Sequence, residues 1–65
     1  MLVELTLFEE EYPNQKVFVN FDNVMSFTTV SDEKESVTVI VTVAGTHIAV
    51  KETAKEIKGM LPSGF

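Results

Sequence analysis

Apolar and polar residues alternate over much of this chain, which is the period of a β-strand with one buried face. In residues 2–8, Val3, Leu5 and Leu7 fall on one side, and Glu4 and Thr6 fall on the other. The same period recurs further along, where the expected inward residues are Val17, Val19 and Phe21, then Met25 and Phe27, then Ile48 and Val50. The pattern predicts five strands, at residues 2–8, 16–21, 24–30, 37–43 and 47–50.

Polar segments separate these strands and predict turns. Residues 9–15 break the alternation with three acids, a proline and an asparagine, which indicates the loop of a hairpin. Residues 20–23 combine Asn and Asp, whose side chains bond nearby backbone groups in turns, and residues 31–36 form a solvated polar loop. Gly45 predicts a tight turn with a positive φ between the last two strands.

After residue 50 the period changes to that of a helix. Thr53 and Glu56 match a capping box, in which each side chain bonds the backbone N–H of the other. Apolar residues then recur at helical spacing, at Ala54, Ile57, Met60 and Leu61, and Pro62 ends the run. We expect a helix at about 53–61. The fold class is therefore mostly β (α+β): a single domain, 1–65, with a five-stranded antiparallel sheet or small open barrel and one short C-terminal helix.

The segment 37–43 contains only β-branched residues, which disfavour a helix and favour a strand. It is apolar on both faces, because four valines alternate with Thr38, Ile40 and Thr42. Either the sheet closes into a barrel around the valines, or its second face packs on another copy of the chain.

Size and composition favour a partner chain. A chain of 65 residues has a thin core and usually needs a disulfide, a metal or a partner subunit. There is no cysteine, and the single histidine, His47, has no carboxylate cluster beside it in sequence. We therefore expect a homo-oligomer, with neither a metal nor another cofactor.

The net charge argues against a nucleic-acid partner. The net charge is −5 with no arginine, whereas phosphate binding depends on clustered Lys and Arg. We expect no nucleic-acid binding.

The first residues carry an early acid and no basic stretch, and the longest uncharged stretch is too short to span a bilayer, so we expect a cytoplasmic protein without membrane insertion.

No residue pattern indicates catalysis. The serines and threonines fit strand surfaces and turns, and no nucleophile is placed beside a base. His47 falls on the strand face opposite Ile48 and Val50, as expected of a surface or interface histidine. We expect that the chain is not an enzyme.

The residues Glu9, Glu10, Glu11 and Tyr12 are the candidate contact site for a partner. Adjacent acids repel one another and are easier to explain if a basic partner meets them. Tyr12 before Pro13 adds an aromatic anchor on a stiffened backbone. The competing interpretations are a solvated loop tip and a charged device that protects a sheet edge from aggregation.

The order of short motifs is similar to that of the small flagellar proteins of the FlbD family. The residues concerned are an N-terminal strand starting Met1-Leu2, the turn at Asn20–Val24, Gly45 within a hairpin, and Ile48–Thr53 leading into Glu56-Ile57. The resemblance covers most of the chain, and it implies the same strand–hairpin–helix fold. The chain departs from that family at residues 9–15, where the family keeps a brief turn. Small phage-encoded proteins of similar layout share these motifs.

These observations predict a non-enzymatic protein-interaction or assembly module that self-associates and is FlbD-like. One alternative is a homo-oligomer that binds a small molecule or nucleotide between subunits, as a phage sponge protein does. Another is an acidic inhibitor of a host protein.

Overall fold

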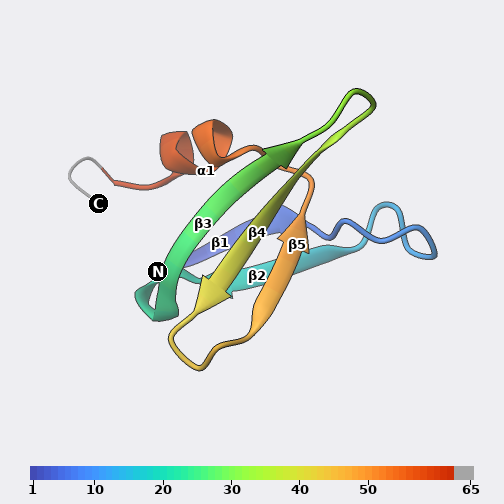
Figure 1. The fold of residues 1–65 in the computed structure, drawn as a ribbon. Helices are drawn as coiled ribbons and strands as arrows, with labels where there is room; N and C mark the ends of the chain where they lie inside the picture. The colour runs from blue at the N-terminus through green and yellow to red at the C-terminus, as the bar shows by residue number, and fades with distance from the viewer. Residues whose placement is uncertain (63–65) are drawn as a thin grey trace.

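The structure, a computed structural model, describes residues 1–62 and contains five strands and one helix in the expected order (Figure 1). The class is confirmed as mostly β with a short C-terminal helix. The elements are β1 (Leu2–Thr6), β2 (Lys16–Asn20), β3 (Val24–Ser31), β4 (Ser36–Thr42), β5 (His47–Val50) and α1 (Ala54–Met60), with a single 3₁₀ turn, η1 (Phe21–Asn23), between β2 and β3.

The strands form two antiparallel sheets, one of β1 and β2 and the other of β3, β4 and β5 in that order. In Figure 1 the β1–β2 ribbon crosses behind the three-stranded sheet, and α1 lies beside β3. Backbone hydrogen bonds join the two sheets beyond the end of β1. The N–H of Lys51 donates to the carbonyl of Thr6 over 2.8 Å, and the N–H of Phe8 donates to the carbonyl of Ala49 over 3.0 Å. The two sheets together therefore form a curled, incompletely closed arrangement of strands.

The strand ends differ from the expected ones for local reasons. β1 ends at Thr6 instead of residue 8, since the next residues bond both β5 and the base of the following loop. β2 ends at Asn20 instead of Phe21, because the Asn20 side chain accepts the N–H of Asp22 and starts η1. β3 and β4 each reach one residue further into their hairpin, where the hydroxyls of Ser31 and Ser36 lie 2.8 Å apart. β4 ends at Thr42 instead of Val43, because the Gly45 N–H donates to the Thr42 carbonyl and begins the turn.

The core lies between the two sheets and under α1. Its fully buried apolar members are Val3, Leu5, Val19, Phe21, Ile40, Val50 and Ile57. Phe21 meets Phe27 edge-on, with ring centroids 5.7 Å apart and ring planes at 81°. The inward positions expected in β1, β2 and β5 are confirmed as buried or half-buried.

The expectation of a barrel closed around the valines of β4 is wrong. Thr38 and Ile40 face the core and are fully buried, whereas the valines face outward and are half-buried or exposed. The neighbouring strands decide this orientation. Ile40 pairs with Phe27 on β3 and Ile48 on β5, so the largest side chains of the three strands share one face and fill the core together.

The expected inward position of Met25 is also wrong. A register shift between Val24 and Ser26 inserts Met25 as an extra residue, and its side chain is 67% exposed. A β-bulge of this kind breaks the strict alternation of faces along a strand. Phe27, beyond the bulge, keeps its expected inward position.

The start of α1 and the last hairpin follow the sequence expectation. The hydroxyl of Thr53 accepts the Glu56 N–H over 3.1 Å and the Glu56 carboxylate accepts the Thr53 N–H over 2.9 Å, which completes the capping box. The N–H of Ala54 donates to the Thr29 hydroxyl over 2.7 Å and so fixes the helix on β3. Gly45 has a φ of 87°, as its turn requires.

Candidate functional site

The acidic loop between β1 and β2 is fully exposed but tied at several points. Glu9, Glu10 and Glu11 all face solvent, and Tyr12 is 60% exposed. The N–H of Leu7 donates to the carbonyl of Gln15 over 2.8 Å, and that of Gln15 donates to the carbonyl of Tyr12 over 3.1 Å. The ammonium group of Lys51 also donates to the carbonyl of Pro13. The predicted contact residues therefore stand on a loop whose backbone is fixed from two sides.

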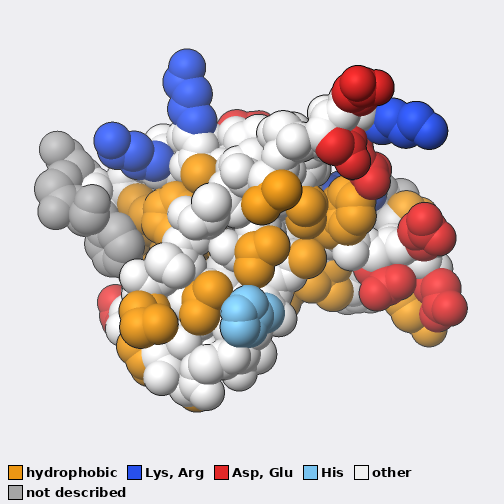
Figure 2. Space-filling model, in the orientation of Figure 1, with side chains coloured by type: hydrophobic (Ala, Val, Ile, Leu, Met, Phe, Trp, Pro, Cys, Tyr) orange, Lys and Arg blue, Asp and Glu red, His pale blue; other side chains and the backbone are white. Residues whose placement is uncertain are grey.

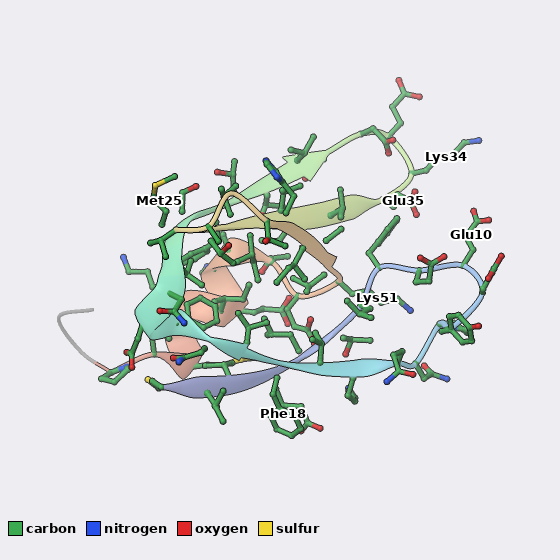
Figure 3. The ribbon with its side chains drawn as sticks, turned by 90° about the horizontal axis from the view of Figure 1, so that it is seen from below. Glu10, Phe18, Met25, Lys34, Glu35 and Lys51 are labelled. Atoms are coloured by element: carbon green, nitrogen blue, oxygen red, sulfur yellow. The ribbon has the colours of Figure 1, made fainter. Side chains whose placement is uncertain are left out.

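A second acidic segment lies at the same end of the molecule. The tip of the β3–β4 hairpin carries Asp32, Glu33 and Glu35, and Glu35 lines the same surface hollow as Glu9 and Glu10. Figure 2 shows acidic side chains from both segments toward one end, and Figure 3 shows Glu10, Glu35 and Lys51 gathered there. We call Glu9–Glu11 and Asp32, Glu33 and Glu35 the acidic end. The sequence analysis missed the second half, because the two segments are distant in the chain and meet only through the fold.

Asp32 forms hydrogen bonds within the hairpin tip. The Asp32 carboxylate accepts the N–H of Lys34 over 2.8 Å and that of Glu35 over 2.9 Å. The backbone bonds from Glu35 and Lys34 lower the pKa of Asp32 below its usual value. Asp32 therefore carries its charge at neutral pH and also orders the turn.

The hollows on the described surface are shallow. The one at the acidic end, about 190 Å³, is lined by Phe8, Glu9, Glu10, Pro13, Glu35 and Lys51. Another, about 440 Å³, lies between β3 and α1 and is lined by Val24, Met25, Ser26, Phe27, Lys58 and Leu61. A third, about 400 Å³, is lined by Leu7, Phe8, Glu9, Val17, His47, Ile48 and Ala49. Small-molecule sites are concave and bury most of their ligand, and all three of these hollows are open to solvent. A ligand site within one chain is therefore less well supported than a protein contact.

Glu52 is a partly buried carboxylate that hydrogen-bonds to Thr6 on β1. The sequence analysis did not single it out. Glu52 accepts the Thr6 N–H with both oxygens, over 2.9 and 3.1 Å, and the Thr6 hydroxyl over 2.9 Å. The Lys16 ammonium donates to the same hydroxyl over 2.8 Å. Burial raises the pKa of Glu52, but the bonds from Thr6, a bond from the Glu52 backbone and the charge of Lys16 together outweigh it, so the pKa lies below its usual value of 4.5. This bond set has a structural role, since it ties β1 to the segment before α1.

The outer side of the three-stranded sheet is the second candidate surface. Its outward residues, which we call the valine face, are Ser26, Thr28, Val30, Val37, Val39, Val41, His47 and Ala49. None of them is Asp, Glu or Lys. Figure 2 shows apolar side chains around His47 on this side of the molecule. The predicted surface or interface position of His47 is confirmed as exposed.

A second exposed apolar patch lies on the other sheet. Phe18 on β2 is 65% exposed and Leu2 on β1 is 66% exposed. Figure 3 shows Phe18 pointing away from the body of the molecule. Unlike the valine face, this patch contains a charge, because Glu4 is paired directly with Phe18.

Two features are absent from residues 1–62. No group of three or more His, Asp or Glu side chains is placed to hold a metal ion there. No helix in that range is long and apolar enough to cross a membrane. No known family model, curated protein or solved structure matches the chain.

Proposed function

We propose that this chain is a non-enzymatic interaction and assembly module of the cytoplasm that associates with further copies of itself. The observation that carries the proposal is the valine face. Val30 is 57% exposed on this surface, and Val37, Val39 and Val41 beside it are half-buried. A contiguous exposed apolar surface on a small protein typically marks an interaction site.

The small core supports the same conclusion. Within residues 1–62, seven apolar residues form its buried part, and a domain of this length buries only about 60% of the surface that its unfolded chain exposes. Association through an apolar face adds buried surface that the single chain lacks. It also stabilises the folded state by mass action, since only the folded chain presents the face.

The acidic end supports a second contact, with a basic protein. Glu9 and Glu10 from one loop and Glu35 from the other line one hollow, where they outnumber the single cation, Lys51, and leave a negative potential. Exposed Tyr12 beside Pro13 supplies an apolar anchor at the edge of this charge. The chain then acts as an assembly module that presents one surface to its own copies and another to a basic partner. An acidic inhibitor of a host protein would use the same end.

The FlbD resemblance belongs to this proposal. It is supported by the order of the motifs along the chain and by the fold class that the resemblance implies. The nucleotide- or metabolite-binding oligomer remains the competing function, and its site would lie between subunits.

The proposal is tested by the mass of the protein in solution. Sedimentation equilibrium over a concentration series from tens to hundreds of micromolar should show a species heavier than the 7.2 kDa chain. A single 7.2 kDa species throughout the series would contradict self-association. A thermal-shift screen distinguishes the alternative, because a metabolite or nucleotide that raises Tm in a saturable manner favours the ligand-binding oligomer.

A further inference from the structure

We propose that two copies of the chain pack back to back through their valine faces, with their acidic ends pointing in opposite directions. This inference rests on the proposed self-association and adds to it the surface, the stoichiometry and the orientation. Three properties of the valine face carry it: its lack of charge, its size and its position relative to the acids.

The lack of charge selects a second copy as the occupant. Each chain has a net charge of −5, so two copies repel each other unless their charges stay apart. The strands β3, β4 and β5 contain no Asp, Glu or Lys, so a basic or acidic partner would find no opposite charge on their outer face. An uncharged apolar sheet face is matched best by an identical face, as in a β-sandwich whose two sheets pack about 10 Å apart.

The size of the face sets the strength of the contact. The seven residues of β4, Ser36–Thr42, extend about 20 Å, and three strands span about 14 Å across, at roughly 3.3 Å per residue and 4.8 Å per strand. Two such faces cover about 600 Å² in projection, and more in accessible surface once side-chain relief is included. Stable interfaces bury about 1,200 Å² or more. We therefore expect a weak, concentration-dependent dimer with a micromolar dissociation constant.

The position of the acids selects the orientation. The hairpin tip with Asp32, Glu33 and Glu35 comes directly before β4, and the acidic loop lies at the same end (Figures 2 and 3). The far end of β4 leads into the turn at Ala44–Thr46, which carries no charge. A twofold axis that crosses β4 at right angles near Ile40 therefore places each acidic end beside the uncharged turn of the other copy. An axis parallel to β4 would bring both acidic ends together, within about a Debye length of 8 Å.

Two matched lysine variants test the surface. Val41→Lys places a charge at the centre of the valine face, and Phe18→Lys places one on the exposed patch of the other sheet. Each changes the net charge from −5 to −4, so greater repulsion between chains cannot explain a loss of association. Thr28→Lys serves as a second face variant, because Thr28 is already exposed and its replacement leaves the core intact. Circular dichroism checks that each variant is folded.

Sedimentation equilibrium then gives separate outcomes for the two proposals. We expect a dimer for the wild type and for Phe18→Lys, and at least a tenfold weaker dimer for the two face variants. If the face variants associate as well as the wild type, the inferred surface is wrong while self-association stands. If the wild type is a monomer throughout, the proposed self-association fails as well.

A distance measurement tests the orientation. The chain contains no cysteine, so Ser36→Cys accepts a single spin label at the start of β4. Ser36 lies four residues from Ile40, so the antiparallel arrangement separates the two Ser36 Cα atoms by about 28 Å, from about 26 Å along the strands and 10 Å between the sheets. The parallel arrangement separates them by about 10 Å. Double electron–electron resonance should give the long distance, whereas dipolar broadening of the continuous-wave spectrum, which marks a short distance between labels, would overturn the inferred orientation.

Discussion

Removing the negative charge of Glu52 should destabilise the fold in a pH-dependent way. In Glu52→Gln, the side chain keeps one acceptor oxygen for Thr6 but replaces the other with an NH₂ group, which donates where the carboxylate accepted. The lost contact joins residues 46 positions apart. Its loss therefore loosens the junction between β1 and the segment before α1.

The magnitude follows from the number and kind of bonds. A hydrogen bond to a charged group contributes about 1.5–3 kcal/mol when well shielded, and Glu52 is only partly buried, so solvent screening reduces this value. We expect Glu52→Gln to lower the free energy of unfolding by ~1–2 kcal/mol at pH 7. In a domain of this size that corresponds to a Tm lower by roughly 5–15 °C.

The pH dependence gives the sharper test. The pKa of Glu52 is lower in the folded state than its usual value of 4.5. The contribution of the carboxylate is therefore present above about pH 4.5 and is lost as the pH falls through the folded-state pKa. The Tm difference between wild type and Glu52→Gln should be largest near neutral pH and should shrink steadily below pH 4.5.

Thermal unfolding followed by circular dichroism at one protein concentration measures both effects. Glu4→Gln is the matched control, because Glu4 is an exposed carboxylate on the same strand as Thr6. The reasoning is refuted if Glu52→Gln lowers Tm no more than Glu4→Gln does, or if its effect is the same at pH 3 as at pH 7.

Four further predictions use other parts of the molecule. Thr53→Ala removes the N-cap of α1 and should cost ~1 kcal/mol in urea unfolding; a loss under about 0.3 kcal/mol would mean that the cap contributes little to the fold. Gly45→Ala should cost about 1–2 kcal/mol because an L-residue is strained at a φ of 87°, with Gly45→Asn closer to wild type. Replacing Glu9, Glu10 and Glu11 by Ser should leave folding intact but abolish binding to a basic partner captured by cross-linking; retained binding with new aggregation would favour edge protection instead. Duplex DNA should not bind at physiological salt in a gel-shift assay, since five lysines without an arginine oppose ten acids, and a salt-sensitive micromolar complex would contradict this.

The sequence by itself determined the order of elements, because each depends on local chemistry. Alternation specifies strands, the Thr53–Glu56 pair specifies a helix start, and Gly45 permits a backbone conformation that other residues resist. The exposed position of the acidic loop also followed from its composition. These features need only neighbours a few residues away, so they can be predicted without knowing the fold.

Only the tertiary structure decided which face of β4 is buried. The strand is apolar on both sides, so its own pattern cannot choose between Ile40 and the valines, and the choice comes from its pairing with Phe27 and Ile48. The same holds for the bulge at Met25, the bond set around Glu52 and the meeting of two acidic loops at one end. Each joins segments far apart in the chain, and a contact between such segments depends on strand register and on the curl of the sheets, which alternation alone does not specify.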